Sequence, residues 1–157
     1  MVEMKLHYTG ETRDLVYGFF MKFSRFEFAL KQSGYVYSGI RDSAQVDWKK
    51  FSQAFGGDYV ADQRETLLLE KPPKKQIYTN DNISWVDFDF TTTSSDLEKL
   101  TLVLRTMRNN LFHGGKYGLK EEDVSDRIHF LLPHGIHTLE RMVKLDNNVK
   151  IHFDGIY

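Results

Sequence analysis

The chain has 157 residues, of which 41% are hydrophobic and 27% are charged, and its formal net charge is −1. These totals predict one globular domain, residues 1–157, with a core of its own. They exclude a strongly basic surface that follows a nucleic-acid backbone, although a local basic site stays open. The absence of cysteine excludes disulfide bonds and thiolate metal sites.

The first residues contain no apolar stretch of the signal-peptide type. No run in the chain approaches the roughly 18 apolar residues that a membrane helix needs. We therefore expect a cytoplasmic protein with no membrane partner.

The first predicted helix begins near Thr9 or Thr12, either of which can cap it, and ends at Gly34. Its apolar residues recur every three or four positions, which is the period of one helix face. They are Leu15, Phe19, Phe23, Phe26 and Leu30. The chain contains twelve Phe, eight Tyr and two Trp. So many rings indicate either a core built on ring packing or a partner subunit that covers some of them.

Two short helices are predicted next. The first follows Asp47, a plausible N-cap, and ends at Gly56. The second lies within residues 60–71 and is stopped at Pro72. The stretch 72–93 is the least helical part of the chain. Residues 83–90 alternate apolar and polar side chains like a strand, but we find no pairing partner and expect an extended connection lying over the core.

Residues 94–115 give the clearest helix. Ser94 or Ser95 caps it, Ser95 and Glu98 have the spacing of a capping box, and Gly114 stops it. Its apolar stripe repeats at intervals of three and four and consists of Leu97, Leu100, Leu104, Met107 and Leu111.

A last helical segment, residues 124–148, contains Pro133, where we expect a kink or a break. The tail beyond it is too short to assign. The chain as a whole is predicted to be an all-α domain, a helical bundle of four to five helices.

Polar side chains gather at the end of the predicted helix 94–115, where the sequence reads RTMRNNLFHGG. Arg108 presents a fixed fork of donors that matches phosphate oxygens, and His113 can exchange a proton near neutral pH. Asn109 and Asn110 add donors for a phosphate or a base edge. Such a set suits the cleavage of a phosphodiester without a metal.

Helix geometry complicates this interpretation. On an unbroken helix Arg108 and His113 point about 140° apart. The two groups meet only if the helix ends at His113 or if they come from different subunits. A structural explanation also stays open, because an arginine, a histidine and a glycine pair are ordinary helix-end residues.

The segment RNNLFHGGK resembles the motif of the HEPN superfamily, in which an arginine is followed by four to six residues and a histidine. The first helix, FFMKFSRFEFALK, and the segment DWKKFSQAF look like one branch of small HEPN proteins. The resemblance implies an all-α bundle of about four helices, a homodimer, and metal-independent RNA endonuclease activity of the toxin–antitoxin or defence type. Arg108 and His113 would be catalytic, with Asn109 as their polar companion. Some members of the superfamily are not nucleases.

Other residues are weaker candidates. In the first helix, Glu27 either orients the motif arginine or forms a local salt bridge, and Arg25 lies beside it as a candidate for substrate binding. Lys116, just past the glycines, is a candidate phosphate ligand. The basic run 71–75 either contacts RNA phosphates or is a solvated loop.

Three histidines, His129, His134 and His137, raise the question of zinc. Their spacing straddles Pro133, and no nearby carboxylate completes a recognisable ligand set. We therefore expect neither a metal nor another cofactor.

The leading hypothesis is a homodimeric, metal-independent RNA endonuclease with a possible antitoxin as its protein partner. The alternative is a non-catalytic helical module that binds a nucleotide, RNA or a protein. A third reading is a structural protein whose polar helix end only caps.

Overall fold

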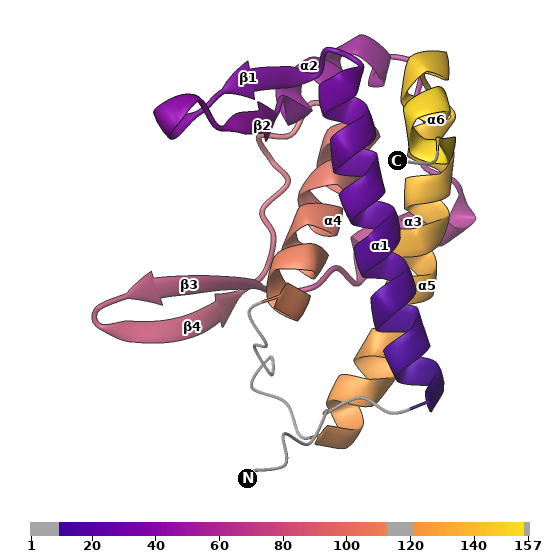
Figure 1. Ribbon diagram of the computed structural model, residues 1–157. Helices are drawn as coiled ribbons and strands as arrows, with labels where there is room; N and C mark the ends of the chain where they lie inside the picture. Colours follow the sequence, from indigo (N-terminus) through magenta and orange to yellow (C-terminus); the bar gives the residue numbers. More distant parts are fainter. Residues whose placement is uncertain (1–9, 113–120, 156–157) are drawn as a thin grey trace, which may run out of the picture.

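The computed structural model of the protein describes residues 10–112 and 121–155, with the side chains of 121–125 left aside. Most of this part of the chain is helical (Figure 1). Its α-helices are α1 (Gly10–Gln32), α2 (Trp48–Phe55), α3 (Gln63–Glu70), α4 (Asp96–Phe112), α5 (Glu121–Val143) and α6 (Asn147–Asp154). Its strands are β1 (Val36–Ser38), β2 (Ala44–Val46), β3 (Lys75–Thr79) and β4 (Asn82–Val86). No helix in these ranges is both long and apolar enough to cross a membrane.

Helix α1 ends where the sequence predicts. Gly34 has a positive φ of 90°, which glycine adopts without strain. The N–H of Tyr35 donates to Leu30 O at 2.9 Å, and the N–H of Gly34 donates to Lys31 O at 3.2 Å. This is the Schellman arrangement of a helix C-terminus. Thr12 does not cap the helix, because it lies inside α1 and its hydroxyl contacts His129 Nε2 at 2.8 Å. Thr9 is outside the described residues.

The predicted apolar stripes of α1 and α4 form the core. Phe19, Phe23 and Phe26 of α1 are completely buried. So are Leu100 and Leu104 of α4. Burying one such side chain stabilises the fold by about 1.5–3 kcal/mol relative to leaving it exposed.

Ring packing extends this core to α2. Phe26 and Phe51 meet edge to face with centroids 5.8 Å apart, and Tyr35 packs against Phe51 in the same way at 5.4 Å. The prediction of a core built on aromatic contacts is confirmed.

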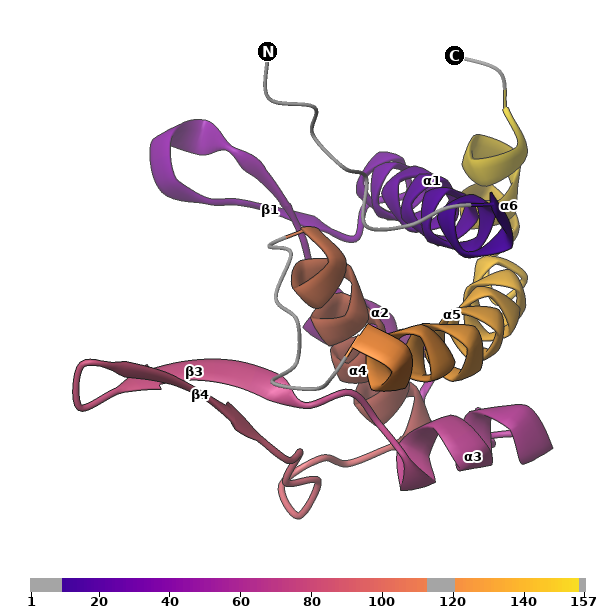
Figure 2. The ribbon, with the colours of Figure 1, turned by 90° about the horizontal axis from the view of Figure 1, so that it is seen from below.

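Helices α1, α4 and α5 run side by side, and α6 lies along α1 (Figures 1 and 2). Gly135 of α5 permits close packing here. A Cβ atom at this position would lie 2.5 Å from Met107 Cε and 3.0 Å from Phe19 Cε2. The absence of a side chain therefore lets α5 approach α1 and α4.

Helix α5 runs through Pro133 as one helix, so of the expected kink or break the break is absent. Proline in a helix removes one backbone donor from the ladder and its ring clashes with the carbonyl one turn earlier, at a cost of about 3 kcal/mol. The apolar residues Ile128, Leu132 and Leu139 are buried on both sides of it. Their burial keeps the helix continuous. The unassigned tail forms α6, which is capped by Asp146.

The stretch 72–93 contains a β-hairpin, and the expectation of an unpaired extended connection is wrong. Strands β3 and β4 pair antiparallel, with Ile77 opposite Ser84. The turn residues Asn80 and Asp81 both have positive φ, of 50° and 61°. This is the conformation of a tight two-residue hairpin turn, which asparagine and aspartate tolerate.

A second hairpin joins β1 and β2, with Tyr37 opposite Gln45. Both hairpins extend from the same side of the helices (Figures 1 and 2). The domain is therefore mostly helical with two small sheets, which the all-α prediction did not include.

Two predicted N-caps are present. The side chain of Asp47 accepts a hydrogen bond from Lys50 N at 2.9 Å and starts α2. The hydroxyl of Ser95 accepts from Glu98 N at 3.2 Å and starts α4. The carboxylate of Glu98 returns to Ser94 rather than to Ser95 itself.

Candidate functional site

Arg108 is the best-defined member of the predicted site. It lies in the last turns of α4, and its Nη2 atom lies 3.5 Å from Glu27 Oε1 of α1. Its guanidinium also lies over the ring of Phe23, 5.4 Å from the centroid. An ion pair and an aromatic face together restrict where this side chain points.

The Arg108 side chain is 35% exposed and that of Glu27 is 24% exposed, so the pair lies at the edge of the α1–α4 interface. Arg108 Nε is buried, and no acceptor for it exists among the described residues. The group is thus partly desolvated and has hydrogen-bonding capacity left, which suits the binding of an anion.

The two asparagines of the motif have different surroundings. Asn109 is exposed, whereas Asn110 is buried at 6% exposure. Asn110 Nδ2 donates to Lys74 O at 3.0 Å and so attaches the start of β3 to α4. Asn110 therefore has a structural contact, whereas Asn109 is exposed.

The basic run 71–75 lies beside the motif. Lys75 and Gln76 line a cavity of about 250 Å³ together with Thr106, Asn109 and Asn110. The long-range hydrogen bond from Asn110 to Lys74 produces this proximity. Sequence reasoning treated the run and the motif as separate features.

Arg25 is not brought to Arg108. Its Nε and Nη2 atoms donate to Phe153 O at 2.9 and 2.6 Å, and Nη2 also donates to Gly155 O. These carbonyls belong to the C-terminal end of α6, where a cation complements the helix dipole. Arg25 and Glu27 point to different sides of α1, about 200° apart by helix geometry.

His113 and Lys116 lie outside the described residues. His113 follows Phe112, the last residue of α4, directly in the sequence.

A further arginine, Arg105, was not among the site residues predicted from the sequence. It lies one turn before Arg108 on α4, and its guanidinium lies 5.6 Å from the centre of the Trp48 ring. Burial lowers its pKa, and the positive charge of Arg108 lowers it further. The spacing of three residues between the arginines was the signal that could have identified this pair on one helix face.

The histidines of α5 have separate partners. His129 contacts Thr12, and His134 Nδ1 contacts Phe130 O at 2.6 Å. His137 Nε2 lies 2.5 Å from Asp62 Oδ2 of α3. Within the described ranges, no group of three metal-binding side chains gathers at one point.

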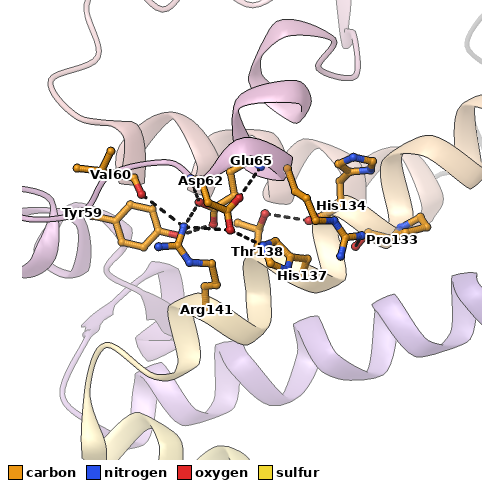
Figure 3. A network of polar contacts seen from close by, with 10 residues as sticks. Tyr59, Val60, Asp62, Glu65, Pro133, His134, His137, Thr138 and Arg141 are labelled. Atoms are coloured by element: carbon orange, nitrogen blue, oxygen red, sulfur yellow. Dashed lines mark hydrogen bonds and ion pairs between the residues drawn. The ribbon is translucent and has the colours of Figure 1, made fainter.

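His137 belongs to a polar network between α3 and α5 (Figure 3). Its centre is Glu65, which is completely buried. One Glu65 oxygen accepts from Tyr59 Oη, and the other accepts from Arg141 Nη1. Asp62 and Glu65 form a capping box at the start of α3. Because these bonds are made within the network, we assign it a structural role in joining the two helices.

The pKa of Asp62 reflects its burial and its contacts within this network. Burial alone would raise that pKa. The hydrogen bonds from the Glu65 N–H and from His137, with the charge of Arg141, lower it below the usual range. Burial raises the pKa of Tyr59, and its hydrogen bond to Glu65 raises it further. The Asp62 carboxylate therefore stays charged and the Tyr59 phenol stays neutral at neutral pH.

Comparison with known proteins identifies no family for the chain. No protein-family model matches the chain, and no curated protein or solved structure matches it significantly.

Proposed function

We propose that the protein is a metal-independent RNA endonuclease of the HEPN type that acts as a homodimer. The observation that carries the proposal is the state of Arg108. It is oriented by Glu27 and Phe23, partly desolvated, and has an unsatisfied Nε donor among the described residues. A guanidinium held in this way is prepared for a phosphate.

In the proposed reaction the RNA 2′-OH attacks the neighbouring phosphorus and the bond to the 5′-oxygen breaks. His113 transfers a proton as general base or acid. Arg108 stabilises the charge that builds on the phosphoryl oxygens, and Asn109 positions the phosphate. The products are a 2′,3′-cyclic phosphate end and a 5′-hydroxyl end. Lys75 beside Asn109 and the nearby Lys116 supply further positive charge for the strand.

The surface of α1 supports a dimer. Tyr17 is 66% exposed, and Phe20 and Met21 are each 39% exposed. They lie on the side of α1 opposite its buried face, near Glu27 in the sequence. An exposed apolar stripe of this kind is typical of a protein–protein contact. We propose that two copies pair through this stripe of α1.

The mostly helical fold is compatible with a HEPN-like bundle, in which the two hairpins are additions. Toxin or defence activity, an antitoxin partner and a cytoplasmic location belong to the same proposal. Induced expression of the wild type should then slow bacterial growth, and His113→Ala should relieve the effect.

The direct test is incubation of the purified protein with RNA in EDTA. We expect cleavage with cyclic phosphate ends, reduced at least about 100-fold in Arg108→Ala and His113→Ala. Cleavage that persists unchanged in His113→Ala would falsify the assignment. Loss of activity in EDTA would instead indicate a metal-dependent enzyme. Light scattering should report a dimer that Met21→Glu converts to monomers.

A second candidate is a module that binds RNA without cleaving it. It is favoured by the guanidinium of Arg108, which can hold a phosphate without a group that transfers a proton. In that case RNA is bound and stays intact, and Arg108→Ala weakens only binding.

A further inference from the structure

A cavity of about 480 Å³ opens between α2 and the first half of α4. Helix α2 contributes Trp48 and Ser52, α4 contributes Arg105, and the preceding loop contributes Ser94. The volume is within the range of small-molecule sites, roughly 300–1,000 Å³. None of the residues predicted from the motif lines it.

Arg105 brings a positive charge into this cavity without a direct counter-ion. Among the described residues, its guanidinium contacts the Trp48 ring and makes no ion pair with a carboxylate. Glu27 attracts it through space, but the ion pair of Glu27 is with Arg108. A partly buried cation of this kind is stabilised by an anion that comes from outside the chain.

Ser52 supplies an independent sign of a ligand. It is 7% exposed, and its Oγ atom is buried without a hydrogen-bond partner in the described part of the chain. Buried hydroxyl groups in folded proteins are nearly always hydrogen-bonded. Ser52 lines the cavity, so rotation about its χ1 bond can turn this hydroxyl toward a polar group bound there.

Glu98 is the acidic side chain among the residues that line the cavity, and it stays charged. Its carboxylate accepts from Ser94 N at 2.9 Å and from Ser94 Oγ at 2.8 Å, and these bonds lower its pKa. The lining also includes Lys49. Two cations against one carboxylate leave the cavity net positive, which favours an anionic ligand.

We propose that this cavity binds a phosphate-bearing, hydroxyl-rich group of about the size of one nucleotide, with its phosphate on Arg105 and a hydroxyl on Ser52. The proposal does not depend on RNA cleavage. The same chemistry comes either from a free nucleotide or sugar phosphate, or from one nucleotide of an RNA strand that continues toward Arg108.

Isothermal titration calorimetry with the purified chain tests this. The probes are ribose 5-phosphate, adenosine monophosphate, adenosine and an eight-nucleotide single-stranded RNA whose 2′-O-methyl groups prevent cleavage. We expect saturable binding of a phosphorylated probe and none of adenosine. Arg105→Gln should weaken that binding at least about tenfold. A response to either monophosphate identifies a free ligand, whereas a response to the RNA alone identifies a strand.

Ser52→Ala separates binding from folding. It removes a hydroxyl that is buried without a partner, so it should raise the unfolding midpoint while weakening binding several-fold. Ser33 is the matched control, because its Oγ atom is also buried without a partner among the described residues but lies outside the cavity. Ser33→Ala should raise the midpoint and leave binding unchanged.

Three results would overturn the proposal. One is no saturable binding of any phosphorylated probe. Another is binding that Arg105→Gln or Ser52→Ala leaves unchanged. The third is binding that Arg108→Gln abolishes while Ser52→Ala has no effect. That result would show that the phosphate binds at Arg108 instead of in this cavity. None of these results depends on whether RNA is cleaved.

Discussion

Glu27 of α1 and Arg108 of α4 form an ion pair, with Oε1 and Nη2 3.5 Å apart, at the edge of the interface between the two helices. The pair sets the direction of the guanidinium, and the Phe23 ring supports it from one face. It joins two segments that the sequence suggested separately as parts of one site.

The ion pair predicts a specific effect on cleavage. Glu27→Gln removes the charge that orients Arg108, so we expect the cleavage rate to fall about tenfold, since a misoriented group loses transition-state contacts. Because the pair is partly exposed, its removal should cost at most about 1 kcal/mol of unfolding free energy. Single-turnover kinetics and urea unfolding measure the two effects.

The control for this variant is Glu140→Gln, which breaks the Lys22–Glu140 pair of 2.7 Å between α1 and α5. It should change stability by a similar amount and leave cleavage unaltered. Equal cleavage rates in the two variants would show that Glu27 has no role in the site.

The adjacent asparagines should behave differently. Asn110→Ala removes a buried donor from Lys74 O and should lower the unfolding free energy by about 1–2 kcal/mol. Asn109→Ala, at an exposed position, should leave stability within about 0.5 kcal/mol and weaken RNA binding. Chemical denaturation and filter binding distinguish them. Equal destabilisation by both substitutions would contradict the assigned roles.

The buried carboxylate of Glu65 should dominate stability at the α3–α5 contact. Glu65→Gln removes the buried charge that pairs with Arg141 and leaves Arg141 only its longer contact with Asp62, at 3.6 Å, so we expect a loss of about 3 kcal/mol. Guanidinium unfolding measures this loss. The double variant with Arg141→Met should recover part of it, because both charges are then absent. Additive losses in the double variant would show that the two groups do not act as a pair.

Alkaline pH should weaken the fold through Tyr35. Burial raises its pKa to about 12 from an ordinary value of 10.0, and the hydrogen bond from Tyr35 Oη to Asp146, at 2.7 Å, adds to this. Because the folded pKa is the higher one, the contribution is complete below pH 10 and is lost as the pH rises toward 12.

The check is the unfolding free energy of the wild type and of Tyr35→Phe between pH 8 and pH 12. The difference between the two proteins should shrink over the upper half of this range. A difference that stays constant to pH 12 would argue against a raised pKa.

Several features of this protein follow from local sequence. The three-to-four spacing of the aromatic residues in α1 and of the leucines in α4 specifies which faces are buried, because helix geometry depends only on neighbouring residues. Asp47, Ser95 and Gly34 mark helix ends for the same reason: each acts on backbone groups within a few residues. Arg108 and its motif were also identified from the local sequence.

Other features required the tertiary structure. The strands of the β3–β4 hairpin are mostly exposed, so they lack the regular hydrophobic alternation that predicts a pair of strands. Their Asn80-Asp81 turn contains no glycine, so its composition did not predict a hairpin either. Helix α5 continues through Pro133 because packing on both sides outweighs the cost of the proline. The cavity of Ser52 and Arg105 exists only because α2 packs against α4. Sequence alone thus determined that the segments of α1 to α5 are helical, since that depends on short-range spacing, but it left α6 unassigned. Tertiary packing decided which polar side chains meet, since these contacts join residues far apart in the chain.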